Sequence, residues 1–153
     1  MGPFLLITTL LTIAGLIATS IAGFMATPSR VADHIMFALV TVVLGLFSQS
    51  MTLFFFIGTG KQLKDKVKDT VHDEEVRRAT RALAMKVSPV ATYAMFVLMI
   101  TFITGGGVAS GKTPRWLHDL LTIASIVMYA RAYWVQIHAM TTSADLMERH
   151  LRD

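Results

Sequence analysis

Two histidines occupy matching positions in the two halves of the sequence. His34 follows a Thr-Pro pair and Arg30, and it lies next to Asp33. His118 belongs to the segment TPRWLHD, in which Asp119 follows it directly. A neutral imidazole is the commonest side-chain ligand for a metal, and a neighbouring carboxylate can orient the ring. The two histidines are therefore the first candidates for a binding site.

Such a pair suits a b-type haem, which histidines on facing helices can hold. The site needs two imidazoles at one level and small residues nearby, which leave room for a flat macrocycle. Arginines at the same edge would meet the haem propionates. We therefore expect a haem b site, with His34 and His118 as the metal ligands, formed by His34, His118, Arg30, Arg115, Gly45 and Thr41.

A structural role for the same two histidines is the alternative. Both lie near the expected ends of helices, where water hydrates an imidazole at little cost. In such a place a histidine can cap a helix or bond to a neighbour without binding any ligand. The sequence leaves both roles open.

Each histidine heads a stripe of small or polar residues. Steps of four and three residues follow one narrow face of a helix. Small and hydroxyl-bearing residues at membrane helix interfaces allow close packing and hydrogen bonds between helices. We therefore expect both stripes to face the inside of a bundle, with the two histidines at similar depth. The stripes are His34, Ala38, Thr41, Gly45, Ser48 and Thr52, and His118, Thr122, Ser125, Tyr129, Ala132 and Gln136.

The elements that carry these stripes are long apolar stretches. Of the 153 residues, 54% are hydrophobic and 16% are charged, whereas about 25% are charged in an ordinary soluble domain. A transmembrane helix needs about 20 mostly apolar residues. Four stretches meet this need, at about residues 4–25, 35–57, 89–104 and 117–140. Ser88 and Pro89 are typical of a helix N-terminus, and we expect the glycines at 105–107 to end the third helix.

The basic residues predict the orientation. Eight of the fourteen Lys and Arg residues lie between positions 61 and 86, and the positive-inside rule places such a segment in the cytoplasm. With four spans, both termini are cytoplasmic, in a bacterial-type inner or plasma membrane. Leu63, Val67 and Val71 recur every four residues, which predicts helix in this segment, and Thr70 with Asp73 resembles a capping box at a break.

The predicted fold is thus an all-α integral membrane protein. It is a four-transmembrane-helix bundle built from two helical hairpins, and residues 1–153 form a single transmembrane domain. A charged helical cytoplasmic connection over residues 61–86 joins the hairpins. The first stretch also carries two adjacent small-residue ridges, which are packing surfaces for another span or another subunit; they are Ala14, Ala18 and Ala22, and Gly15, Thr19 and Gly23.

One face of the fourth stretch carries a different set of residues. Arg131, Trp134 and His138 share the face opposite His118, which is typical of an anchor at the membrane interface. Arg131 either extends its charge to the cytoplasmic surface or binds a quinone, propionate or lipid headgroup together with Gln49 and Gln136.

Composition narrows the function further. The chain has no cysteine, which excludes disulfides, thiolate metal sites and iron–sulfur clusters. It has no phosphate-binding loop, nucleophile elbow or dinucleotide fingerprint, so we expect no stand-alone enzyme. The net charge of +4 belongs to the membrane orientation and predicts no nucleic-acid partner.

Two functions remain as expectations. The first is a small polytopic membrane protein that binds a b-type haem and takes part in electron transfer. The alternative is a cofactor-free accessory or assembly subunit of a larger membrane complex. In either case the partners are the lipid bilayer and either other membrane subunits or further copies of the chain.

Overall fold

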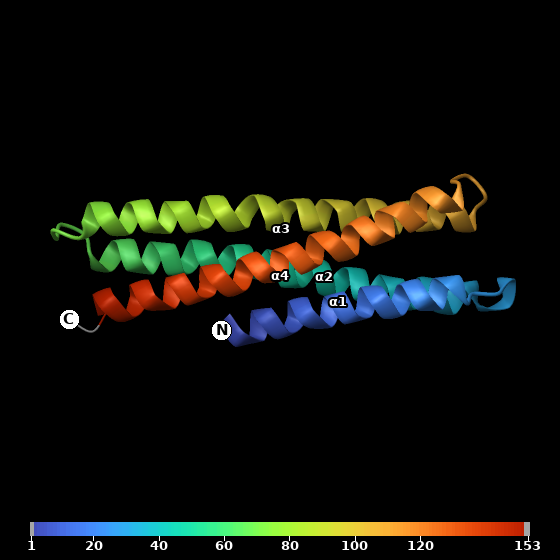
Figure 1. Ribbon diagram of the computed structural model, residues 1–153, viewed down its shortest axis with the longest axis horizontal. Helices are drawn as coiled ribbons and strands as arrows, with labels where there is room; N and C mark the ends of the chain where they lie inside the picture. The colour runs from blue at the N-terminus through green and yellow to red at the C-terminus, as the bar shows by residue number, and fades with distance from the viewer. Residues whose placement is uncertain (1, 152–153) are drawn as a thin grey trace.

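Four long helices make up the protein (Figure 1). The computed structural model describes residues 2–151, with the side chains of Pro28 and Leu151 left aside. A short 3-10 turn lies between the first two helices. The elements in chain order are α1 (Gly2–Phe24), η1 (Pro28–Arg30), α2 (Val31–Lys66), α3 (Asp73–Ala109) and α4 (Arg115–Leu151).

All four helices are long and apolar enough to cross a membrane, by length and composition. Large apolar side chains such as Phe24, Phe54 and Ile103 are two-thirds exposed on the outside of the bundle. In water this surface would be costly. The prediction of an all-helical protein with four helices that are able to span a membrane is confirmed.

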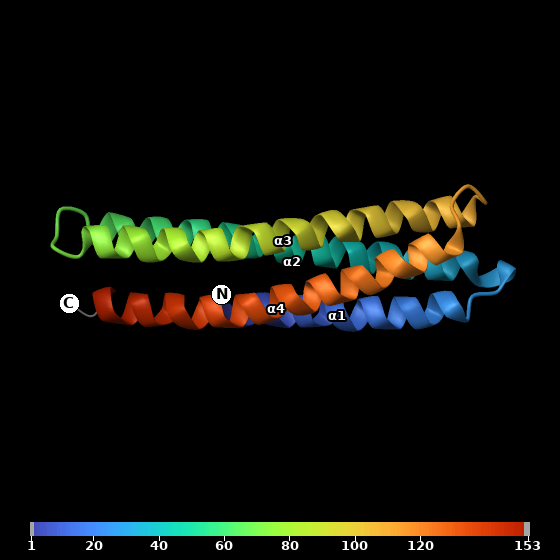
Figure 2. The same cartoon turned by 45° about the horizontal axis from the view of Figure 1, so that its top comes forward.

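The helices form a ring in which each packs against two neighbours. α2 packs between α1 and α3, and α4 packs against both α3 and α1. We call α1 with α2 the first helix pair and α3 with α4 the second. The connections within both pairs lie at one end, the histidine end, and the turn at 67–72 lies at the other, the charged end (Figures 1 and 2). Helix α1 begins well short of the charged end.

The charged end is a three-helix extension with its own small core. Leu63, Val67 and Val76 are buried there, and Leu146 and Met147 of α4 pack against them. The central connection is therefore largely helical, as predicted, with its break at residues 67–72.

The predicted capping box at this break is wrong. The Thr70 hydroxyl donates to the Val67 carbonyl at 2.6 Å, so it turns back toward α2. The N-cap of α3 is His72, and no side chain caps that terminus. Asp69 has a φ of 64°, the left-handed conformation that lets the chain reverse here.

Two predicted boundaries of the third helix are also wrong. Helix α3 runs continuously through Pro89, because Val87, Ala91 and Ala94 are buried on both sides of it and their packing outweighs the lost backbone hydrogen bond. The glycines at 105–107 lie within the same helix. The chain turns only at Gly111, whose φ of 71° is the left-handed conformation that usually follows a helix end.

Both polar stripes face the interior, as predicted. On α2 the residues Thr41, Gly45, Ser48 and Thr52 are buried, and His34 and Ala38 are half-buried. On α4 the buried members are Ser125, Tyr129, Ala132 and Gln136, with His118 and Thr122 half-buried.

A buried chain of hydrogen bonds joins α1, α2 and α4 midway along the bundle. The Thr9 hydroxyl lies 2.7 Å from that of Ser48 and 2.9 Å from Oε1 of Gln136. Gln136 Nε2 donates to Gln49 Oε1 at 2.8 Å. Since Arg131 is exposed while both glutamines are fully buried, the idea that Arg131 forms a site with Gln49 and Gln136 is wrong.

The two small-residue ridges of α1 have different surroundings. Gly15 lies against α2, where a Cβ at this position would be 3.0 Å from two side-chain atoms of Thr41. Ala14 and Ala18 are exposed on the outside of the bundle. The glycine ridge therefore packs within the first helix pair, whereas two of the three alanines of the other ridge are exposed and Ala22 is half-buried.

Candidate functional site

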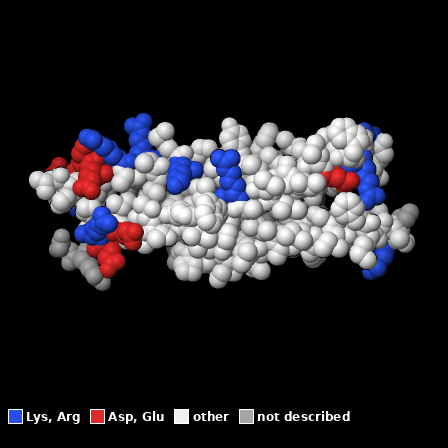
Figure 3. All heavy atoms as spheres, in the orientation of Figure 1, with Lys and Arg blue, Asp and Glu red and all other residues white. Residues whose placement is uncertain are grey.

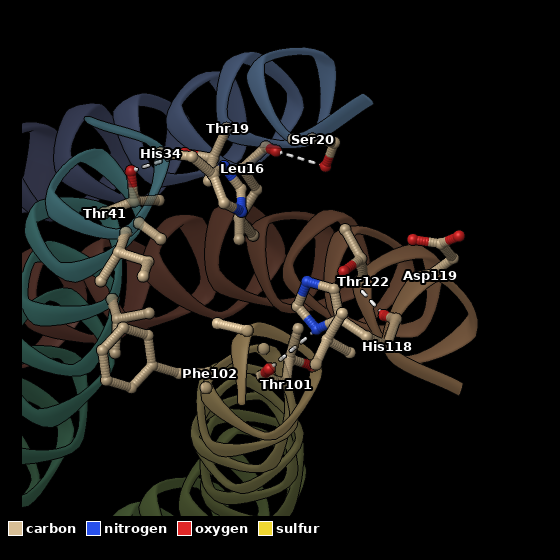
Figure 4. A pocket seen from close by; sticks show the side chains of 18 of the residues that line it. Leu16, Thr19, Ser20, His34, Thr41, Thr101, Phe102, His118, Asp119 and Thr122 are labelled. Carbon is tan, nitrogen blue, oxygen red and sulfur yellow. Dashed lines mark hydrogen bonds between the residues drawn. The ribbon is translucent and has the colours of Figure 1, made fainter. Parts of the chain in front are cut away.

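His34 and His118 line the same cavity at the histidine end. Its volume is about 570 Å³, and residues of all four helices form its walls. Figure 4 shows the two imidazoles extending from different helix pairs toward the space between them. A cavity of this volume falls in the range of small-molecule and cofactor sites, roughly 300–1,000 Å³. The two histidines therefore lie at the same end of the bundle and line one cavity within a single chain.

The first helix pair holds His34 against a glycine. A Cβ at Gly23 of α1 would lie 2.9 Å from Cε1 of the His34 ring, so the ring rests directly on the α1 backbone. His34 Nδ1 is buried, and it has no hydrogen-bond partner among the described residues.

The second helix pair holds His118 in the same way. A Cβ at Gly105 of α3 would lie 2.9 Å from Cε1 of His118. His118 Nδ1 lies 3.1 Å from the backbone carbonyl of Thr101, one turn before that glycine. Because a carbonyl oxygen only accepts, the proton is on Nδ1. The lone pair is then on Nε2, which is the arrangement of a metal-binding histidine.

Hydroxyl pairs complete the likeness between the two sides. Thr19 Oγ1 lies 3.2 Å from Thr41 Oγ1, and Thr101 Oγ1 lies 2.8 Å from Ser125 Oγ. In both cases the threonine precedes the glycine by four residues and its hydroxyl partner follows the histidine by seven. We call each set a half-site: Thr19, Gly23, His34 and Thr41 in the first pair, and Thr101, Gly105, His118 and Ser125 in the second.

Both half-sites contain a Thr-x-x-x-Gly element that was not predicted as part of a site. Thr19 and Gly23 were predicted only as part of a packing ridge. The repeat is visible in the sequence as TSIAG at 19–23 and TFITG at 101–105. Its meaning depends on the register between neighbouring helices, which places each glycine opposite a histidine.

The deeper walls of the cavity are apolar. Leu16, Val42 and Leu98 line it and also belong to a buried cluster that includes Tyr129. Gly45 does not line the cavity, because it lies in this cluster: a Cβ there would be 2.7 Å from Leu98, 2.8 Å from the Tyr129 hydroxyl and 2.9 Å from Thr12. The prediction that Gly45 leaves room for a macrocycle is therefore wrong, because side chains of the protein fill the space next to it. Thr41 does line the cavity.

Only one of the two predicted arginines reaches the cavity. Arg115 lines it, and its guanidinium lies 5.6 Å from the centre of the Phe24 ring and 3.8 Å from the Asp119 carboxylate. Arg30 does not line it and instead lies 3.7 Å from Asp33 in an exposed pair. The charged rim of the cavity is therefore on α4.

The cavity also reaches the outer surface of the bundle. Ile35, Ile103 and Ile123 line it, and all three are exposed on the outside. The cavity is therefore bounded in part by side chains of the outer surface.

The other described histidines lie elsewhere. His138 Nδ1 bonds to the Trp134 carbonyl at 2.9 Å on the exposed face of α4. The rings of His72 and His150 lie 5.2 Å apart at the charged end. Among residues 2–151 no group of three or more His, Cys, Asp or Glu side chains is placed to hold a metal ion. A haem iron needs only one or two ligands from the protein, because the macrocycle provides the other ligands.

Comparison with known proteins yields no relative, so the functional proposal rests on the half-sites. No family model, no curated protein and no solved structure matches the chain.

Proposed function

We propose that the protein is a small integral membrane protein that binds one b-type haem between His34 and His118 and carries electrons. The observation that supports this most strongly is the pair of half-sites. Each helix pair presents one imidazole, backed by a glycine, to the same cavity. A ligand with two equivalent binding faces fits such an arrangement.

The residues present fit a haem in two respects. His118 keeps its Nε2 lone pair free because Nδ1 bonds to Thr101. The cavity walls are mainly apolar, which suits the macrocycle. Nδ1 of His34 has no hydrogen-bond partner among the described residues, so either ring nitrogen of His34 could serve as the second ligand.

The rim at Arg115 suits the charged edge of a haem. Its guanidinium would pair with a propionate carboxylate, and Asp119 already holds it at the cavity. When bound, haem supplies reversible one-electron chemistry. The chain itself holds both ligands, orients His118 and keeps the site dry.

We further propose that the four helices form two transmembrane hairpins in a bacterial-type inner membrane. Helix α1 has 23 residues, about 34 Å at 1.5 Å per residue, which matches a hydrocarbon core of about 30 Å. Eight of the fourteen basic residues lie between positions 61 and 86. The charged end and both termini are then cytoplasmic, and the histidine end faces outward.

The absorbance spectrum of the purified protein tests the haem proposal. The chain is produced with an adequate haem supply, purified in detergent, oxidised and then reduced with dithionite. We expect a Soret band that shifts on reduction, with one haem per chain. A protein that stays colourless under these conditions, and also fails to take up added haemin, contradicts the proposal.

A second candidate is a cofactor-free subunit of a larger membrane complex. It is favoured by the exposed alanines 14 and 18 of α1, because small residues on a lipid-facing helix allow close contact with another helix. Isolation of a stable complex from the native membrane, with the same yield for haem-free variants, would support it. A detergent-purified protein that is monomeric and copurifies with nothing counts against it.

A further inference from the structure

Two exposed basic residues lie between the ends of the bundle on α3 and α4. They are Lys86 of α3 and Arg131 of α4. Figure 3 shows the view onto these helices: charged side chains gather at both ends, and the middle is uncharged except for a few basic groups. A lipid-facing position is costly for a charged side chain, so each of these residues needs a negatively charged partner.

The two residues belong to one short stretch of this face. Val87, next to Lys86, shares a packed cluster with Val135 and Ala139 of α4. Arg131 precedes Val135 by one turn, about 6 Å along the helix, toward the histidine end. Lysine and arginine side chains are long enough to carry their charged groups over such a distance. The two basic residues therefore lie within about two helical turns of each other along the bundle.

The protein provides no acidic partner in this stretch. No Asp or Glu occurs between Glu75 and Asp119, or between Asp119 and Asp145. At the charged end, in contrast, Arg77 and Arg78 each lie next to an acidic side chain of the same helix. Arg77 bonds to Asp73 at 2.6 Å, which raises the pKa of its guanidinium.

The stretch lies where the proposed membrane placement puts the cytoplasmic boundary. A Cβ at Gly2 would lie 3.6 Å from Met140, so α1 begins at the level of this part of α4. Trp134 is 66% exposed, and its ring lies 4.6 Å from that of His138. Exposed Trp and His side chains of this kind mark a membrane–water interface.

We propose that Lys86 and Arg131 bind the phosphate headgroup of an anionic phospholipid of the cytoplasmic leaflet. The lipid phosphate supplies the negative charge for these two basic residues. Between Glu75 and Asp145 the chain has one acidic residue, Asp119, and it lies at the histidine end. Its acyl chains lie along the exposed apolar surface of α3 and α4. The inference rests on the proposed membrane placement and is independent of the haem.

Native mass spectrometry and thermal unfolding test it together. The full-length protein is reconstituted in nanodiscs of phosphatidylcholine alone, or with one-third phosphatidylglycerol. We expect wild type to retain phosphatidylglycerol and to unfold at a higher temperature in its presence. The variant Lys86→Gln with Arg131→Gln should bind this lipid roughly 30-fold more weakly, about fivefold per basic residue. The conservative variant Arg131→Lys should keep most of the binding.

Matched controls neutralise basic residues elsewhere. Arg78→Gln removes a charge that already bonds to Glu74 at 3.1 Å, and Lys112→Gln removes one at the histidine end; neither should change lipid retention. Equal retention by the double variant and wild type overturns the proposal, as does equal retention of phosphatidylcholine. Stabilisation by inorganic phosphate as large as that by the lipid would identify a free-phosphate site instead and also overturn it.

Discussion

Gly105 lies directly against the imidazole of His118, and a Cβ at this position would be 2.9 Å from Cε1. Gly23 has the same relation to His34. The variants Gly105→Ala and Gly23→Ala should therefore displace the imidazole that each backs and weaken haem binding, by roughly 10- to 100-fold, as when other supports of a metal ligand are lost. Titration of the purified variants with haemin measures the change.

A glycine away from the cavity gives a matched control for this prediction. Gly58 of α2 does not line the cavity, and a Cβ there meets nothing within 4 Å, so Gly58→Ala should bind haem like wild type. It should also be slightly more stable, by about 0.5–1 kcal/mol, because alanine favours a helix over glycine. Equal loss of haem in the Gly58 and Gly105 variants would show that the contact with His118 has no special role.

The hydroxyl pairs of the half-sites should contribute to stability and leave ligand binding largely intact. Thr101 bonds to Ser125 through its side chain and to His118 through its backbone. Thr101→Val keeps the backbone carbonyl but removes the hydroxyl's contacts with Ser125 Oγ and with the Leu121 carbonyl at 3.1 Å. It should cost about 1 kcal/mol, at roughly 0.6 kcal/mol for each such bond in a membrane protein. Chemical unfolding in detergent measures this cost, with the exposed Thr92→Val as the control. Complete loss of haem in Thr101→Val would contradict this division of roles.

The buried glutamine pair should hold α2 and α4 together midway along the bundle. Gln136→Leu removes the donor to the buried Gln49 Oε1 and one of the acceptors of the Thr9 hydroxyl, which keeps its contact with Ser48. It should cost about 1–3 kcal/mol of unfolding free energy. The double variant with Gln49→Leu removes both amides and should be less destabilised than the sum of the single variants. Strict additivity in this double-mutant cycle would mean that the bond contributes nothing.

The two arginines that precede the histidines should differ in effect. Arg115 lines the cavity and Arg30 does not, although their sequence contexts look alike. Arg115→Gln should lower haem affinity by about fivefold to tenfold, since a charge-assisted bond is worth about 1.5–3 kcal/mol at most and this one is partly exposed. Arg30→Gln should leave the affinity unchanged. Equal effects of both substitutions would place the propionates elsewhere.

Much of the architecture could be predicted because periodicity is a local property. The stripes that begin at His34 and His118 repeat with the helical period, and their burial follows from that pattern. The common depth of the two histidines followed from the position of each near the start of its helix. Long apolar stretches gave the number of helices for the same reason.

The errors came from features that depend on tertiary contacts. Ser88 and Pro89 resemble a helix start, yet packing on both sides keeps α3 continuous. Gly45 resembles open space, yet Tyr129 and Leu98 fill it. The contact between Gly23 and His34 depends on the register of α1 against α2, which no pattern within one helix contains.

The most direct test of the paired half-sites compares histidine variants by the reduced-minus-oxidised absorbance spectrum of haem-loaded protein. His34→Ala and His118→Ala should each abolish or strongly shift the Soret and α bands, because each removes one of two ligands. His138→Ala and His72→Ala, which alter histidines outside the cavity, should keep the wild-type spectrum. A wild-type spectrum in either His34→Ala or His118→Ala would contradict a haem held between the two helix pairs.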